Sequence, residues 1–267
     1  MLDVEWILLF LLLGTVVGFM AGLLGIGGGG IMVPILTSIY LSQGIPLENV
    51  VHLALGTSMA SIIITSISSL RTHNAKGAVI WGVVKSMAPG IIVGTFFATL
   101  IVSYINSFYL ALLFSIFMAY VGIQMFLNKK PNHTHRLASN TQLLIAGGGI
   151  GAISALVSIG GGSLTVPYLL KQNIDIKKAI GTSAAIGLPI SIAGTLGYVI
   201  NGWGSYSAGS YTFGYVYLPA VLLISIVSFF TAPYGAKLAH RLNISTLKKV
   251  FSVLLIILSI KMLISVL

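Results

Sequence analysis

The stretch GFMAGLLGIGGGGIMVPIL at residues 18–36 decides the fold, because it recurs as GAISALVSIGGGSLTVPYL at residues 151–169. The two copies align at a constant offset, with Gly27 on Gly160 and Pro34 on Pro167. Each copy is an apolar helical segment, a run of glycines and a second short apolar segment that contains a proline. Apolar segments interrupted by glycine at matching places in two halves of a chain point to the central binding site of a membrane transporter.

The composition places the chain in a bilayer. Of the 267 residues, 57% are hydrophobic and 7% are charged, whereas soluble domains carry roughly 25% charged residues. A net charge of +10 would suggest nucleic acid in a soluble protein, but here the basic residues lie in short loops, where they set orientation. Cysteine is absent, which excludes disulfides and a cysteine nucleophile. No cleaved signal peptide is expected, since Asp3 and Glu5 stand where such a peptide is basic.

Six segments have the length and hydropathy of simple membrane-spanning helices, which need about 20 mostly apolar residues. They are residues 52–70, 79–103, 108–127, 179–200, 215–236 and 248–267. Two further segments, 6–41 and 142–170, are too long for one crossing, and each contains a glycine run. If each of these returns to the side where it began, nearly all Lys and Arg fall on one side, as the positive-inside bias requires. Each is therefore predicted to be a hairpin-like or re-entrant element.

Each half consists of one such element and three transmembrane helices. Because the chain crosses the membrane an odd number of times in the first half, the second half starts on the opposite side of the membrane. The predicted fold is an all-α polytopic membrane protein with two inverted-topology repeats, which is typical of secondary transporters. The first repeat covers residues 1–127, a cytoplasmic linker covers 128–141 and the second repeat covers 142–267. The N-terminus is predicted outside. Whether the return arms, 31–41 and 163–171, cross fully is left open, since at about 1.5 Å per residue they are nearer half-spans.

The internal repeat extends beyond the glycine runs. Small residues spaced by four occur in both halves, and such ridges let helices pack closely in lipid: Gly14, Gly18 and Gly22 match Gly147, Gly151 and Ala155. Further along, ALGTS at residues 54–58 recurs as AIGTS at residues 179–183. Two separate motifs in the same order make chance similarity improbable.

The glycine runs are predicted to form an anion site. The return helices are expected to begin just after Gly30 and Ser163, with Ser163 as an N-cap. Their N-termini, with free N–H groups and partial positive charge, would point back at the glycine runs and form a neutral cage for a small oxyanion. Hydroxyls of two Thr-Ser pairs add donors. The candidate substrate-binding residues are Gly27, Gly28, Gly29, Gly30, Thr57, Ser58, Gly160, Gly161, Gly162, Ser163, Thr182 and Ser183.

Structural explanations compete with these assignments. Glycine runs in membrane helices also serve as packing surfaces, and intramembrane Ser and Thr often bond back to their own helix. The GxGxxG match at residues 25–30 follows a membrane helix and no strand, so a dinucleotide fold is excluded. No Asp or Glu lies within a predicted span, which removes a carboxylate proton relay. His52, His73 and His240 lie at span boundaries, where a histidine is more often solvated than a proton carrier.

At these residues the chain resembles the sulfite exporter TauE/SafE family. The resemblance rests on GLLGIGGGGIMVPIL, its echo ALVSIGGGSLTVPYL, the two GTS motifs and APYGAKLAH at residues 232–240. It implies a permease of the bacterial inner (plasma) membrane for sulfur-containing anions, such as sulfite or sulfoacetate, without a cofactor. The partners expected are that anion and the lipid bilayer, with no nucleic acid, and self-association into a homo-oligomer is left open.

The expected function is efflux of a small sulfur-containing oxyanion by alternating access around the glycine-lined site at the repeat interface. The alternatives are an anion channel and a membrane-embedded assembly partner without transport. An integral-membrane enzyme would need a midplane cluster of His, Asp, Glu or Cys, and the sequence contains none. The aromatic loop at residues 201–215, with Trp203, Tyr206 and Tyr211, is predicted to be an interfacial belt rather than a lid.

Overall fold

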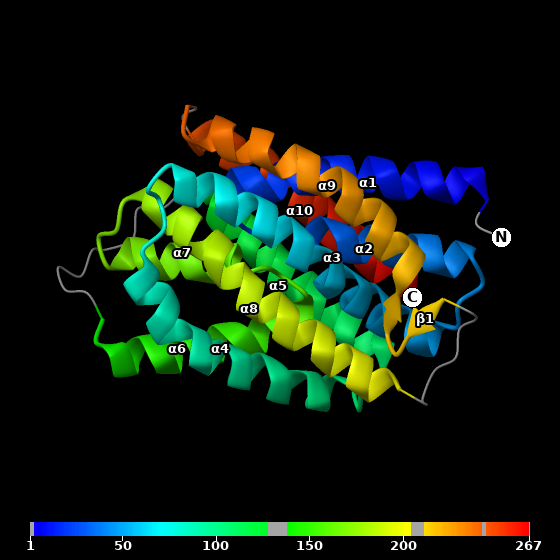
Figure 1. The fold of residues 1–267 in the computed structure, drawn as a ribbon. Helices are drawn as coiled ribbons and strands as arrows, with labels where there is room; N and C mark the ends of the chain where they lie inside the picture. Colours follow the sequence, from blue (N-terminus) through cyan, green and yellow to red (C-terminus); the bar gives the residue numbers. More distant parts are fainter. Residues whose placement is uncertain (1–2, 128–137, 204–210, 242–243, 267) are drawn as a thin grey trace.

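The computed structural model describes residues 3–127, 138–203, 211–241 and 244–266, and these are almost entirely helical (Figure 1). A two-stranded antiparallel ladder is the departure from the predicted all-α fold. In chain order the elements are α1 (Val4–Leu24), α2 (Gly29–Ser42), α3 (Leu47–Ala75), α4 (Trp81–Val102), α5 (Ser107–Leu127), α6 (Asn140–Val157), α7 (Gly162–Lys171), α8 (Ile176–Gly202), β1 (Thr212–Phe213), β2 (Val216–Tyr217), α9 (Leu218–Ala239) and α10 (Ile244–Val266).

Seven of the described helices are long and apolar enough to cross a membrane, namely α1, α3, α4, α5, α6, α8 and α9. Five of them coincide with predicted simple spans, and α10 coincides with the sixth. The other two, α1 and α6, are the first arms of the glycine-broken segments. Large apolar side chains such as Leu12, Phe97 and Ile116 are exposed on the outside of the bundle, which a surface in contact with lipid requires and a soluble protein avoids.

Both glycine runs break the helix, as predicted. A residue in the left-handed conformation ends each first arm: Gly25 (φ 69°) caps α1 and Ser158 (φ 45°) caps α6. The return arms α2 and α7 have 14 and 10 residues. At 1.5 Å per residue they are about 21 and 15 Å long, so neither crosses a hydrocarbon core of about 30 Å by itself. The chain reverses at the first break, so that α1 and α3 begin at the same end of the bundle (Figure 1).

The two longest helices, α3 and α8, form the centre of the bundle. They are the most buried of the candidate spans and pack against each other. On one side α1 packs along α9, and on the other α6 packs along α4 (Figure 1). A Cβ on Gly14 would lie 2.7 Å from the Ile224 carbonyl oxygen, and a Cβ on Gly147 would lie 2.5 Å from that of Met87. The spaced glycines are therefore helix-packing ridges, as the sequence predicts.

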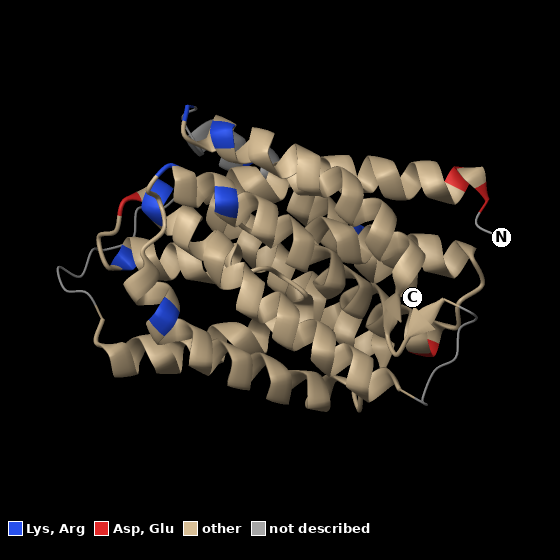
Figure 2. Ribbon diagram, viewed as in Figure 1, with Lys and Arg blue, Asp and Glu red and all other residues tan. Residues whose placement is uncertain are grey.

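Charges gather at the ends of the bundle. Most Lys and Arg positions lie at one end (left in Figure 2), whereas the first turns of α1 and α3, with Glu5 and Glu48, lie at the other. Asp175 is at the basic end, where its carboxylate accepts hydrogen bonds from the backbone N–H groups of Lys177 and Lys178 and so caps α8. This separation fits a bundle whose two ends face different compartments.

Two predicted loops differ in detail from the structure. The linker predicted over residues 128–141 ends earlier, because Ser139 and Gln142 form a capping box that starts α6 at Asn140; residues 128–137 lie outside the described part. In the aromatic loop, Trp203 and Tyr211 are exposed, whereas Tyr206 lies outside the described residues. The end of that loop folds into the β1–β2 ladder, which packs against α3.

Candidate functional site

The two glycine breaks meet at the centre of the bundle. A Cβ placed on Gly27 would lie 2.7 Å from the Cα atom of Gly160, and a Cβ on Gly160 would lie 2.7 Å from the Cα atom of Gly27. A Cβ on Gly29 would overlap the Ser158 carbonyl oxygen, and one on Gly162 would overlap that of Gly25. Only glycine permits such backbone contact. The structure thus brings four predicted glycines together at the contact between the breaks, namely Gly27, Gly29, Gly160 and Gly162. The other three face elsewhere: Gly28 faces Val17, Gly30 faces Met118 and Gly161 faces Ile186.

Each break also lies against the GTS motif of the other half. The Ser183 hydroxyl donates to the Gly25 carbonyl oxygen at 3.3 Å and to that of Ile180 at 2.8 Å. In the second break the Ser158 hydroxyl donates to the Leu55 carbonyl oxygen at 3.1 Å. The Ser58 hydroxyl is buried and has no hydrogen-bond partner among the described residues. Of the three serines in the predicted set, Ser183 therefore lies against the first break and Ser163 directly follows the second.

The two threonines of the predicted set have a structural contact instead. Thr57 accepts a hydrogen bond from the backbone N–H of Tyr217, and Thr182 accepts one from that of Ile80, both at 3.0 Å. Tyr217 and Ile80 directly precede α9 and α4. The hydroxyls thus satisfy N–H groups at the starts of two peripheral helices, each in the opposite half of the chain.

Replacing Thr57 by valine is expected to destabilise the protein by about 1–3 kcal/mol, because the substitution leaves a partly buried N–H without its acceptor. Thr57→Ser keeps a hydroxyl at this position and serves as the matched control. Thermal unfolding of both purified variants in detergent measures the difference. An equal Tm for Thr57→Val and Thr57→Ser would mean that the hydrogen bond contributes nothing to stability.

The return helices start two residues earlier than predicted. α2 begins at Gly29 after the N-cap Gly28, and α7 begins at Gly162 after the N-cap Gly161. The prediction that Ser163 is the N-cap of α7 is wrong, since Ser163 lies within the first turn. Glycine is itself accepted at N-cap positions, and Gly161 holds that position before α7.

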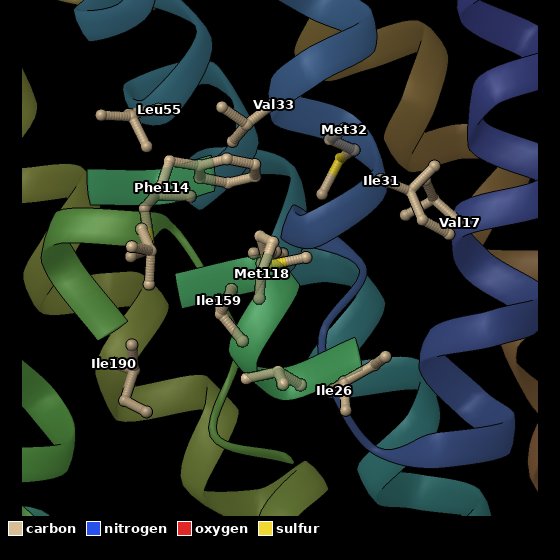
Figure 3. Packing of buried hydrophobic residues seen from close by; sticks show 14 of the residues in the cluster. Val17, Ile26, Ile31, Met32, Val33, Leu55, Phe114, Met118, Ile159 and Ile190 are labelled. Carbon is tan, nitrogen blue, oxygen red and sulfur yellow. The ribbon is translucent and has the colours of Figure 1, made fainter. Parts of the chain in front are cut away.

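Apolar side chains surround the breaks (Figure 3). Ile26 and Ile159, at matching positions in the two breaks, are buried together with Phe114 and Met118 of α5. A Cβ on Gly30, in the first turn of α2, would overlap the Met118 methyl group. The space between the two helix N-termini is therefore filled by backbone contact and apolar packing, and an anion could enter only if the breaks moved apart.

A large groove reaches both breaks from one side. It has a volume of about 660 Å³ and lies between α5 and α7, touching Ile26 of the first break and Ser163 just after the second. Tyr120, Gln124 and Lys171 line it as well. On the opposite side of the bundle α2 packs directly against α10, where the Ser38 and Ser265 hydroxyls are 3.4 Å apart. The bundle is thus open between α5 and α7 and closed between α2 and α10.

Sequence reasoning missed a narrow crevice beside the first break. It has no room for a water molecule in this arrangement and is lined by Gly25, Gly27 and the hydroxyl residues Thr65, Ser66 and Ser69 of α3. The signal was available in the run TSISS at residues 65–69, which places several hydroxyls within one membrane span. Polar side chains within a span mark functional positions more often than those at its ends.

Two of the boundary histidines are buried, against the expectation of solvated side chains. His52 lies 3.1 Å from the Val102 carbonyl oxygen. The Nε2 atom of His73 is 2.9 Å from the Gly22 carbonyl oxygen, and its Nδ1 atom is 3.1 Å from Nε2 of His240. Because a carbonyl only accepts, Nε2 of His73 carries the proton, and Nδ1 accepts from His240. Burial, and then the nearby Lys177 and Lys76, lower the pKa of His240.

Known proteins are similar to this chain over nearly its whole length. A family model described as "Sulfite exporter TauE/SafE" matches residues 10–262. A "Probable membrane transporter protein" of Haemophilus influenzae is 39% identical over 258 residues, which are 96% of this chain and 98% of the relative. Another protein so described, from Methanocaldococcus jannaschii, is 30% identical over 275 residues and 98% of each chain. No solved structure matches.

Proposed function

The chain belongs to the sulfite exporter TauE/SafE family of membrane transporters, and we propose that it exports a small sulfur-containing oxyanion, sulfite or an organosulfonate such as sulfoacetate. The observation that carries the proposal is the meeting of the two glycine breaks at the centre of the bundle. Broken helices within a membrane are tolerated where protein buries them or where they line a cavity, and transporters place their substrate sites there.

Matched contacts support two inverted-topology repeats, residues 1–127 and 142–267. Gly14 of α1 packs on α9, and its counterpart Gly147 of α6 packs on α4. In the same way, Thr57 of α3 binds the residue before α9, and Thr182 of α8 binds the residue before α4. Each of these contacts between halves recurs with the roles of the halves exchanged, as a two-fold axis in the membrane plane would produce.

The unequal sides of the bundle support alternating access. Under the proposed symmetry α5 and α7 correspond to α10 and α2, yet the first pair is separated by the large groove and the second pair is packed together. Exchanging these two arrangements would close the groove and open the opposite side. The substrate would meet the same breaks from either compartment.

The proposed binding residues are the twelve predicted ones. When the breaks move apart, the first-turn N–H groups of α2 and α7 would face a common space, and helix N-termini favour anions. The hydroxyls of Ser58 and Ser183, in the two GTS motifs, would add donors. The set is Gly27, Gly28, Gly29, Gly30, Thr57, Ser58, Gly160, Gly161, Gly162, Ser163, Thr182 and Ser183.

The proposed location is the inner membrane of a bacterial cell, with the N-terminus and the first turn of α3 outside. The basic end of the bundle (Figure 2) would then lie in the cytoplasm together with the linker, in line with the positive-inside bias. This orientation directs the large groove by Lys171 toward the cytoplasm. An exporter would take up its substrate from that side.

Flux of labelled sulfite into proteoliposomes tests the proposal. We expect saturable flux that is faster toward the positive side, because a potential of 100 mV favours movement of one negative charge by about 2.3 kcal/mol. Unlabelled sulfite on the opposite side should accelerate exchange, and sulfoacetate should compete. Empty liposomes are the control.

Each alternative gives a different result in the same experiment. An anion channel would show flux without saturation and without accelerated exchange. A membrane-embedded assembly partner would show no flux above empty liposomes. Either result would overturn the proposal of an alternating-access carrier, and the second would also remove sulfite as a substrate.

A further inference from the structure

The last turn of each first arm is bound by a side chain of the central helix in the same half. In the first half the Nε2–H group of His73 donates to the Gly22 carbonyl oxygen at 2.9 Å. In the second half the Tyr198 hydroxyl donates to the Ala155 carbonyl oxygen, also at 2.9 Å. Counted from the GTS motifs His73 corresponds to Tyr198, and Gly22 matches Ala155 in the glycine ridges. Both carbonyls belong to a last helical turn, where oxygens lack a partner within the helix, so the contact is a repeated one.

The two matched side chains differ in whether they take up a proton. A tyrosine hydroxyl is neutral up to about pH 10, so the contact of Tyr198 has one charge state at physiological pH. Histidine changes its charge between about pH 5 and pH 8. His73 is buried, but its Nδ1 atom lies 3.1 Å from Nε2 of His240. His240 directly follows α9 and is partly exposed at the basic end of the bundle (Figure 2), where a proton from solvent reaches it.

The histidine pair can bind one proton without losing either hydrogen bond. In the neutral pair, His73 donates to Gly22 from Nε2 and accepts at Nδ1 from Nε2 of His240. The added proton binds Nδ1 of His240, because an imidazolium donates from both nitrogens. The bond between the rings then becomes charge-assisted, and such bonds are roughly twice as strong as neutral ones. The last turn of α1 favours this cation, since the C-terminus of a helix carries partial negative charge.

The charged groups around His240 leave such a proton weakly held. Burial, and then Lys177 and Lys76, lower the pKa of His240, whereas Asp175 raises it. The Lys177 ammonium group donates to the His240 carbonyl oxygen at 3.2 Å, which keeps that cation beside the pair. On α9 the ammonium group of Lys237 lies over a tyrosine ring, and the last turn of α1 contains no charged residue. A further negative charge nearby would therefore favour protonation.

The pair lies about one helical turn from the first break. Gly22 precedes Gly25, the left-handed residue that ends α1, by three residues, which is about 4.5 Å along a helix. Charges at such separations interact strongly inside a protein, because the effective dielectric constant there is far below that of water. An anion held at the first break and a proton on the pair would therefore stabilise each other.

We propose that His73 and His240 form a proton-binding site whose occupancy raises the affinity of the first break for the transported anion. The inference rests on the proposed function and adds a second ligand, a proton taken up from the basic end. By thermodynamic reciprocity, the anion raises the affinity of the pair for the proton by the same factor. The second half, with Tyr198 at the matching position, binds the last turn of its first arm independently of pH.

Three variants separate the proton from the hydrogen bond. His73→Tyr installs the residue of the second half, which keeps a hydroxyl donor for the Gly22 carbonyl oxygen and removes the proton site. Tyr198→Phe is the matched control, because it removes the equivalent bond to Ala155 and leaves the histidine pair intact. His240→Gln changes a partly exposed residue, keeps an N–H donor for His73 and binds no proton, so it tests the proposal even if His73→Tyr does not fold.

The first readout is the half-saturating concentration of sulfoacetate in proteoliposomes, measured as competition against labelled sulfite at about pH 6 and about pH 8, the range in which histidine titrates. Sulfoacetate is used because its charge is constant over this range. For the wild-type protein we expect a value about fivefold or more lower at the lower pH, the size of a typical coupling between two sites. Tyr198→Phe should lose stability and keep this change. His73→Tyr and His240→Gln should give equal values at both pH values.

The second readout observes the proton directly. Nitrogen NMR of the protein with labelled histidine follows His240 as the pH is lowered, and His240→Gln identifies its signal by the loss of that signal. We expect saturating sulfoacetate to move the midpoint of this titration to higher pH, by the same factor in proton affinity that the transport assay gives for the anion. In His73→Tyr the midpoint should no longer respond to sulfoacetate.

The outcomes separate this inference from the proposed function. If the wild-type protein transports sulfite and its affinity for sulfoacetate is equal at both pH values, the proton site is wrong and the proposed function stands. The same conclusion follows if His73→Tyr and His240→Gln keep the wild-type pH dependence, or if sulfoacetate leaves the His240 midpoint unchanged. If the wild-type protein neither transports sulfite nor binds sulfoacetate, both the inference and the proposed function fall.

Discussion

Gly27→Ala is expected to abolish sulfite transport, because the new methyl group would meet the Cα atom of Gly160 at 2.7 Å. The contact is with backbone and not with a flexible side chain, so one of the two breaks must shift. Gly27 also has φ +73°, where a residue with a Cβ costs roughly 1–2 kcal/mol. Strain and contact together would hold the breaks apart and prevent the closed arrangement through which alternating access must pass.

Two matched variants separate strain from contact. Gly44→Ala places a methyl group at nearly the same backbone angle, φ +79°, but meets nothing within 4 Å. It should lose a little stability and keep transport. Gly160→Ala makes the same contact from the other side, with its Cβ 2.7 Å from the Gly27 Cα atom, and should lose transport as Gly27→Ala does. The measurement is potential-driven sulfite flux per folded protein. Wild-type flux in Gly160→Ala would show that the contact between the breaks is not needed.

The sequence predicts the fold well because a bilayer allows few solutions. Apolar segments of sufficient length must be helices there, and the segment boundaries follow from composition to within a few residues. The glycine breaks were also predictable, because a run such as Gly27–Gly30 has no side chains to hold a helix together in lipid. The prediction that each broken segment returns to the side where it began came from the placement of Arg and Lys in the loops.

The contacts between the halves could not be predicted to the same degree. That Gly27 faces Gly160 depends on how two distant segments approach, and the repeat alone does not give that geometry. The same holds for Thr57, whose hydroxyl would have been expected to bond to its own helix but accepts from Tyr217 of the other half. Partner choice among buried hydroxyls is decided by tertiary packing.

The hydroxyl-lined crevice was missed for a related reason. Serines at positions 66 and 69 look like ordinary small residues of a membrane helix, where they commonly serve close packing. The Ser69 hydroxyl has no hydrogen-bond partner within the described part of the chain, and that is a property of the packed structure. His73 is similar, since its burial depends on the approach of Gly22 and His240.

Gly147→Leu is expected to prevent α6 from packing against α4 and so to lower the yield of folded protein severely. A Cβ at Gly147 would lie 2.5 Å from the Met87 carbonyl oxygen, and a leucine side chain would push the two helices apart along their whole contact. Overpacking costs typically 1–3 kcal/mol even where side chains can adjust, and here the obstacle is backbone. Lipid offers no hydrophobic force to restore the contact, since helices in a bilayer associate through close packing.

Gly149→Leu provides the matched control, because it places the same residue two positions further along the same helix. Gly149 is exposed and has nothing within 4 Å of an added Cβ, so its leucine would face lipid and add a favourable apolar contact. Thermal unfolding and size-exclusion chromatography in detergent compare the two. Equal stability of both variants would mean that α6 does not pack on α4 through Gly147. If α1 packs on α9 by the same geometry, Gly14→Leu must lower the stability of the protein as Gly147→Leu does, because its Cβ would meet the Ile224 carbonyl oxygen at 2.7 Å. A loss of stability in one of these two variants but not in the other would remove the main support for the inverted repeat.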